Sequence, residues 1–137
     1  MRKIKIKAKD QTPLVILDKE SSIMEIKGYS YPDEAHNFYD DIINWFKEYS
    51  TDPNSNTKLT FDFAYVNSTS IKFFNDILKK LDSIAAAGKQ VQVEWYYSAD
   101  DEDMQQLGAV LKDFHKVPFS ILPKNITKEN NGKQKLF

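Results

Sequence analysis

With 137 residues and 41% hydrophobic residues, the chain is long and apolar enough to form one globular domain with a substantial core. A formal net charge of −1 gives no overall attraction to nucleic acid, and the absence of cysteine excludes disulfides and thiolate chemistry. No apolar run reaches the length of a membrane span, and the N-terminus lacks a signal-peptide core. We therefore expect a cytoplasmic protein with neither a nucleic-acid nor a membrane partner.

The first third of the chain predicts strands followed by a helix. Lysine alternates with apolar residues over residues 2–9, which indicates an edge strand rather than a basic nucleic-acid arm. Residues 13–17 and 22–27 predict two short strands joined by a turn. Residues 28–31 are expected to form a loop, with Pro32 at the first position of a helix. The apolar stripe of that helix consists of Ala35, Phe38, Ile42, Trp45, Phe46 and Tyr49.

A strand that runs directly into a helix is the most informative part of the sequence. Apolar residues at positions 59, 61, 63 and 65 recur with the two-residue period of a strand, so Tyr65 is expected on its buried side. The apolar character of residues 59–66 further predicts a central strand buried on both faces. From Ile71 the period changes to the three- and four-residue spacing of an amphipathic helix, which is expected to stop at Gly88.

Four polar residues occupy this strand–helix junction: Asn67, Ser68, Thr69 and Ser70. The first amides of a helix have no partner inside the helix, so such a position favours an anion, including the phosphate of a modified hydroxyl. Asn, Ser and Thr are also the preferred residues for capping a helix. The pattern alone therefore fits a phosphorylation switch or simple capping.

The second half of the chain repeats the alternation of strand and helix. Residues 90–97 predict a strand, Asp100 or Asp101 caps a third helix, and residues 117–122 predict a last strand. The stripe of the third helix is expected at Met104, Leu107, Leu111 and Phe114. We assign residues 1–123 to one domain and residues 124–137 to a polar tail, which includes a glycosylation-type triplet at 125–127 that is meaningful only after secretion.

This order of elements predicts an α/β fold: a single domain with a mixed, mostly parallel sheet of five or six strands and about three helices. In a parallel sheet the acidic run at residues 100–103 shares an edge with Ser68. These carboxylates could bind a divalent cation, although acidic residues also complement the dipole of a helix start. The four glycines form no nucleotide-binding fingerprint, and His36 and His115 lack metal-ligand spacing.

The junction resembles that of STAS domains, in which a serine after a buried strand is phosphorylated by a partner kinase. The chain is more similar still to the SiaC-type regulatory phosphoproteins, a STAS-like family, over roughly residues 14–122. The matching segments are Gly28-Tyr-Ser-Tyr-Pro32, Phe38-Tyr39, residues 67–72 of the junction, Val93-Glu-Trp-Tyr-Tyr97 with the acidic run, and Pro118-Phe119. One departure is that Ser68 replaces the family's threonine, while Thr69 occupies a serine position.

The resemblance implies a non-catalytic regulatory phosphoprotein without a cofactor or a metal. Its implied partners are a Ser/Thr kinase, a phosphatase and a downstream effector, which in some members is a diguanylate cyclase. Ser68 is the expected phosphoacceptor and Thr69 the second choice. The alternative is a small ligand-binding domain or enzyme that uses the edge with Ser68 and the acidic run, which would require a closed pocket there. The expected partner-binding residues are Asn67, Ser70, Lys72, Ser30, Tyr31, Asp100, Asp101 and Asp103.

Overall fold

The computed structural model describes residues 1–124 of the chain. The predicted tail, including its glycosylation-type triplet, lies outside these residues except for the last residue of the final strand, Lys124. The elements in chain order are β1 (Ile4–Ile6), β2 (Leu14–Asp18), β3 (Ile23–Ser30), α1 (Ala35–Tyr49), β4 (Asn56–Val66), α2 (Ser68–Ala86), β5 (Gln90–Ser98), α3 (Glu102–Phe114) and β6 (Phe119–Lys124).

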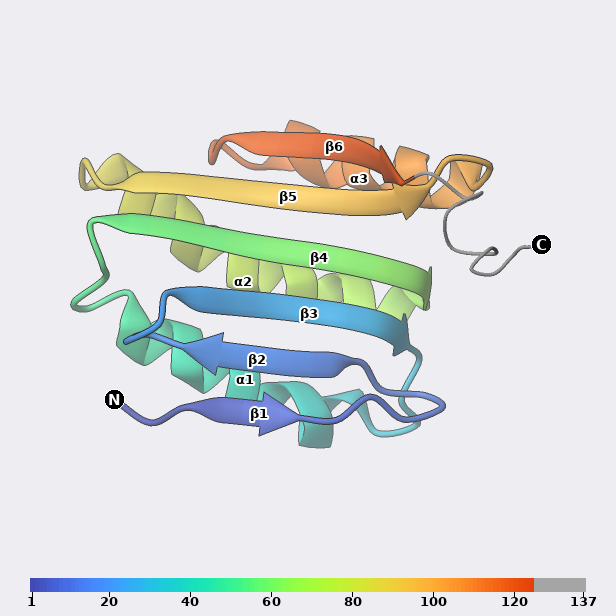
Figure 1. Cartoon of the computed structure of the whole chain (residues 1–137), viewed down its shortest axis with the longest axis horizontal. Helices are drawn as coiled ribbons and strands as arrows, with labels where there is room; N and C mark the ends of the chain where they lie inside the picture. Colours follow the sequence, from blue (N-terminus) through green and yellow to red (C-terminus); the bar gives the residue numbers. More distant parts are fainter. Residues whose placement is uncertain (125–137) are drawn as a thin grey trace.

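The six strands of the described chain form one sheet in the order β1-β2-β3-β4-β5-β6. The first two pairings are antiparallel, and β3 through β6 run parallel. Each parallel strand is added on the same side of the previous one, so right-handed crossovers place every helix on one face. Figure 1 shows α1, α2 and α3 together behind the sheet. The predicted α/β fold with a mixed, mostly parallel sheet and three helices is confirmed.

The core lies between the sheet and this single layer of helices. Strand β4 contributes Leu59, Phe61 and Phe63, which are at most 2% exposed, and it lies between β3 and β5 as predicted. Burial of this strand on both faces is wrong, because none of the helices within residues 1–124 covers its other side. Ala64 on that side is exposed. The helices face the core with the stripes predicted from their spacing, apart from Phe114, which is 75% exposed at the end of α3.

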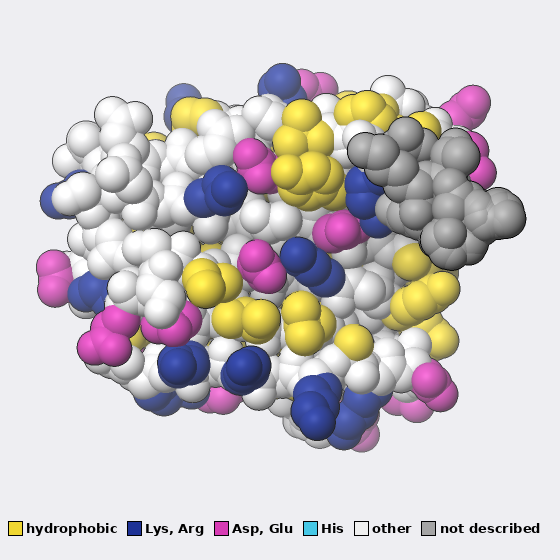
Figure 2. Space-filling model, in the orientation of Figure 1, with side chains coloured by type: hydrophobic (Ala, Val, Ile, Leu, Met, Phe, Trp, Pro, Cys, Tyr) yellow, Lys and Arg dark blue, Asp and Glu magenta, His cyan; other side chains and the backbone are white. Residues whose placement is uncertain are grey.

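The uncovered face of the sheet carries charged side chains of alternating sign, visible as neighbouring blue and magenta groups in Figure 2. Lys124 donates to Asp62 at 2.7 Å, Lys58 lies 3.7 Å from Glu94, and Lys27 lies 3.4 Å from Glu25. The first two pairs join different strands, and the third joins two residues of β3. Opposite charges paired in this way favour a sheet face that is in contact with water. They contribute little to stability individually, because they are exposed to water.

Two boundaries near the start of α1 differ from the prediction. Strand β3 continues through Gly28 to Ser30, where the sequence suggested a loop, and α1 begins at Ala35 rather than at Pro32. Gly28 has φ +122°, a conformation that favours glycine, yet β3 stays paired with β4 on both sides of it. Glycine therefore permits an irregular strand here instead of ending it.

Candidate functional site

Helix α2 starts at the carboxyl end of β4, at the edge where β3 and β5 also end. Asn67 is the N-cap residue, and its Oδ1 atom accepts the backbone N–H of Ser70 at 2.9 Å. The backbone N–H of Asn67 donates to the carbonyl of Ser30 at 2.9 Å. The first turn of α2 is therefore attached to the end of β3 as well as capped by its own side chain.

The three hydroxyl residues of this turn have different environments. Ser68 and Thr69 are exposed, whereas Ser70 is fully buried. The Ser70 hydroxyl donates to the Ser30 carbonyl at 3.1 Å and accepts from the Ser30 hydroxyl at 2.7 Å. The first two residues are therefore accessible from solvent, whereas the Ser70 hydroxyl becomes accessible only if the turn opens.

Ser30 and Ser70 have side chains that are 0% exposed. This revises the expectation that they contact a partner directly, because their hydroxyls bond to each other beneath the surface. They support the site from within. The helical period contained a signal for this arrangement: Ser70 precedes the buried Phe74 by four positions and the buried Ile77 by seven, so it shares their inward face.

Lys72 is exposed one helical turn after Ser68, and its ammonium group lies 5.9 Å from the centre of the Phe73 ring. His36 of α1 packs edge-on against the same ring, with a centroid separation of 5.0 Å. His115, at the opposite end of α3 from the acidic run, contacts Asp82 and Asn75 of α2 at 2.8 Å each. The two histidines are thus held in separate contacts between helices.

Three tyrosines form an aromatic cluster beside the start of α2, on the uncovered face of the sheet. Tyr29 and Tyr65 are about half exposed, at 49% and 50%, and Tyr31 is intermediate. The Tyr31 ring lies edge-on to Tyr65 at 5.7 Å and to Tyr29 at 6.3 Å. Figure 2 shows hydrophobic side chains gathered at this end of β3 and β4. We call Tyr29, Tyr31 and Tyr65 the tyrosine cluster.

The tyrosine cluster depends on an irregularity that sequence reasoning missed. Gly28 pairs with Phe63 and Tyr29 pairs with Tyr65, so Ala64 is an extra residue in β4. Such a bulge changes the facing of the residues that follow it. Tyr65 consequently points outward, contrary to the prediction, while Val66 returns to the buried face.

The acidic run begins helix α3. Asp101 is the N-cap, and its Oδ1 atom accepts the backbone N–H of Met104 at 3.1 Å. Asp100 and Asp103 are exposed, and the run lines an open surface hollow. Because β4 and β5 are parallel, the run shares an edge with Ser68 as predicted. Within residues 1–124, no three His, Cys, Asp or Glu side chains are placed to hold a metal ion.

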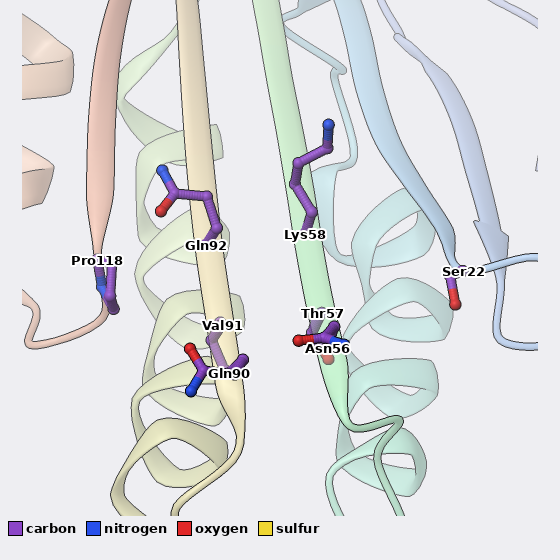
Figure 3. A pocket seen from close by; sticks show the side chains of 8 residues that line it. All are labelled: Ser22, Asn56, Thr57, Lys58, Gln90, Val91, Gln92 and Pro118. Carbon is purple, nitrogen blue, oxygen red and sulfur yellow. The ribbon is translucent and has the colours of Figure 1, made fainter.

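Another hollow lies at the opposite edge of the sheet, at the amino ends of β4 and β5 (Figure 3). It is open, with a volume of about 450 Å³. Open α/β sheets form their ligand crevice where the direction in which successive strands are added reverses. In this sheet the strands within residues 1–124 are all added in one direction, so there is no such point. Because this pocket lies at the opposite edge of the sheet from Ser68, it gives no support to a ligand site at Ser68. Its lining residues are Ser22, Asn56, Thr57, Lys58, Gln90, Val91, Gln92 and Pro118.

Residues 6–124 match the family model described as "SiaC family regulatory phosphoprotein". The chain belongs to the SiaC family. An uncharacterized protein of Pseudomonas aeruginosa strain UCBPP-PA14 is 26% identical over 121 residues, which cover 88% of this chain and 96% of that protein. Membership of the SiaC family agrees with the fold and with the resemblance seen in the sequence.

Two solved SiaC structures are similar to this chain. Apo-SiaC from Pseudomonas aeruginosa is 25% identical, with a TM-score of 0.81 over 89% of this chain and 99% of SiaC. In a second structure, SiaC is the activator bound to the diguanylate cyclase SiaD of that organism, and the match has 25% identity and a TM-score of 0.83. This match covers 88% of this chain and 99% of the other.

No helix within residues 1–124 is long and apolar enough to cross a membrane.

Proposed function

We propose that this SiaC-family protein is a non-catalytic, cytoplasmic switch whose Ser68 is phosphorylated by a Ser/Thr kinase and dephosphorylated by a phosphatase. In its unmodified form it binds a diguanylate cyclase effector. The observation that carries the proposal is the different exposure of the three junction hydroxyls: Ser68 and Thr69 are exposed at a helix N-terminus, and Ser70 is buried. The chain belongs to a family of regulatory phosphoproteins, so an exposed hydroxyl at this place is the expected acceptor. Thr69 is the second candidate acceptor.

A phosphate at Ser68 should change partner binding rather than the fold. It adds about −1.5 to −2 charges near neutral pH. At the start of α2 these charges face the positive end of the helix dipole, so the domain tolerates them. A partner surface that accommodates a neutral hydroxyl would have to desolvate a dianion, which typically costs several kcal/mol of binding free energy. The exposed carboxylates of Asp100 and Asp103 lie at the same edge of the sheet and add to the negative charge that a partner would meet there.

The partner surface that we propose surrounds Ser68. It includes Asn67, Lys72 and Tyr31 together with Asp100, Asp101 and Asp103, as expected from the sequence, and Tyr29 and Tyr65 extend it. Tyrosine is enriched among the residues that dominate binding energies, because its ring contributes large contact area at low entropic cost. The half-exposed rings of the tyrosine cluster are therefore suited to contact the effector.

The test is phosphorylation by the partner kinase with ATP, followed by intact-mass measurement and mapping of the modified residue. Wild type is compared with Ser68→Ala, Thr69→Ala and, as a matched control, Ser83→Ala, which changes another exposed serine of α2. We expect Ser68→Ala to lose most of the labelling, and the other two variants to keep most of it. If Ser68→Ala is labelled as fully as wild type, the acceptor assignment is wrong.

Binding to the cyclase tests the second half of the proposal. We expect Ser68→Ala to bind it like the unmodified wild type. Ser68→Asp should fold with an unchanged circular-dichroism spectrum but bind poorly, because it carries a negative charge at the modified position. Equal binding by the two variants would count against a charge-based switch.

A further inference from the structure

A buried group of three hydroxyls lies directly beneath the proposed phosphoacceptor turn. Ser30 of β3, Tyr39 of α1 and Ser70 of α2 are all 0% exposed. The Ser30 Oγ atom is 2.5 Å from the Tyr39 hydroxyl and 2.7 Å from the Ser70 Oγ atom. The group therefore links the strand before the site, the neighbouring helix and the helix that carries the site.

Two hydrogen bonds of this group have a known donor, and together they determine the donor of the third. Ser70 donates its proton to the carbonyl of Ser30 at 3.1 Å, and Ser30 donates to Ser70 Oγ. The proton between Ser30 and Tyr39 therefore comes from the phenol. Burial raises the pKa of Tyr39 above its usual range, so the phenol remains a donor at neutral pH.

These bonds hold the acceptor residues from both sides. Asn67 donates its backbone N–H to the Ser30 carbonyl, which also accepts the Ser70 hydroxyl. Ser68 and Thr69 are the two residues between these attachment points. Their positions relative to β3 consequently depend on Ser30, whose hydroxyl is held in turn by Tyr39.

We infer that Tyr39, acting through Ser30 and Ser70, is a positioning residue that sets the placement of the Ser68 hydroxyl for phosphoryl transfer. This inference rests on the proposed function, because it assumes that Ser68 is the acceptor. Transfer rates depend steeply on the placement of the acceptor oxygen, since misplacement by about 1 Å can slow a reaction by about 100-fold.

Helix α1 provides a matched control at its other end. Tyr49 is also 0% exposed, and its hydroxyl lies 2.6 Å from Thr57 Oγ1 at the opposite edge of the sheet. The Tyr39 ring stacks on Phe73 with a centroid separation of 5.2 Å, and the Tyr49 ring stacks on Trp45 at the same separation. Phenylalanine at either position keeps the stacked ring and removes the buried phenolic hydroxyl. At position 39 this removes the bond to Ser30, and at position 49 it removes the bond to Thr57 and the acceptor of the Asn54 N–H.

The experiment compares full-length wild type, Tyr39→Phe and Tyr49→Phe in two measurements. The first is amide hydrogen exchange at Ser70 and Ile71, whose N–H groups bond to Asn67. We expect exchange about five- to tenfold faster in Tyr39→Phe, the equivalent of one lost hydrogen bond, and unchanged in Tyr49→Phe. A purely structural role predicts global destabilisation by both variants and no selective change in this turn.

The second measurement is labelling with ATP and clarified extract of the source organism as the kinase, with modified residues mapped by mass spectrometry. We expect the initial rate of Ser68 phosphorylation to fall by at least about fivefold in Tyr39→Phe and to stay unchanged in Tyr49→Phe. Should Tyr39→Phe fail to fold, Ser70→Ala replaces it, because it removes another of the three linked hydroxyls, the one on α2, and keeps the cap from Asn67.

The outcomes separate this inference from the proposed function. A labelled wild type with equal exchange and equal rates of Ser68 phosphorylation in Tyr39→Phe and Tyr49→Phe overturns the positioning role and leaves the proposed function standing. A wild-type chain that accepts no phosphate at Ser68 or Thr69 refutes the proposed function and this inference with it. Selective changes in Tyr39→Phe support both.

Discussion

Replacing Gly108 with alanine should destabilise the domain, although alanine is the better helix former. A Cβ atom at position 108 would lie 2.5 Å from Cδ1 and 2.8 Å from Nε1 of Trp95. Trp95 is fully buried, and its indole N–H donates to the carbonyl of Met104 at 2.8 Å. The ring cannot move aside without losing this bond or compressing the core, so α3 must shift away from β5.

The opposing contributions can be compared. Alanine gains about 1 kcal/mol of helix propensity over glycine. Overpacking a core costs about 1–3 kcal/mol, and loss of the indole hydrogen bond costs about 1 kcal/mol more. We therefore expect the free energy of unfolding to fall by about 1–3 kcal/mol, and Tm to fall by roughly 3–10 °C for a domain of this size.

Urea and thermal unfolding measure this change, with a double-mutant cycle as the control. In the Trp95→Phe background the smaller ring relieves the clash, so Gly108→Ala should become neutral or stabilising there. Ala109→Gly, on the exposed side of α3, should cost about 1 kcal/mol from helix propensity alone. A higher Tm for Gly108→Ala in the otherwise native chain would refute the packing argument.

Three further predictions concern the helix cap, the loss of stability at low pH and the tyrosine cluster. Asn67→Ala should lower the free energy of unfolding by about 1 kcal/mol in urea titrations, because the Ser70 amide loses its acceptor; an unchanged midpoint would contradict this. Desolvation tends to raise the pKa of Asp18, but the Ser21 backbone and hydroxyl and the Lys3 ammonium outweigh it and hold the pKa below its usual range. Its folded pKa is lowered, so this contribution to stability is present above about pH 4 and is lost as the pH falls further. Asp18→Asn should therefore flatten the acid limb of a Tm-versus-pH curve, and an unaltered limb would count against the assignment. Tyr65→Ala should leave Tm nearly unchanged because the ring is half exposed, yet weaken cyclase binding by about tenfold in calorimetry; full affinity would remove the tyrosine cluster from the proposed surface.

The fold could be predicted because hydrophobic periods change clearly at the element boundaries. The two-residue period through Phe63 and the helical period from Ile71 identify β4 and α2 without tertiary information. The single covered face was less apparent, although polar residues at positions 58, 60 and 62 carried a signal for it. The aromatic and aliphatic content of the strand outweighed that alternation in the prediction.

The candidate site could be predicted only in part. The exposed hydroxyls of Ser68 and Thr69 follow from their place at a helix start. The outward orientation of Tyr65 could not be predicted. The extra residue Ala64 is not visible in the composition or the strand propensity of β4, yet it changes the face of the sheet to which the next residues point. The bond between Tyr39 and Ser30 joins two elements and depends on how α1 packs, which local patterns do not specify.

The central claim is that phosphate at Ser68 controls effector binding. The most direct test is titration of the source organism's SiaD-like diguanylate cyclase with this chain in two forms, unmodified and stoichiometrically phosphorylated, with the modified residue confirmed by mass spectrometry. We predict that phosphorylation raises Kd by about 100-fold or more, which corresponds to about 2.7 kcal/mol or more of lost binding free energy. Equal or tighter binding by the phosphorylated chain would contradict the account.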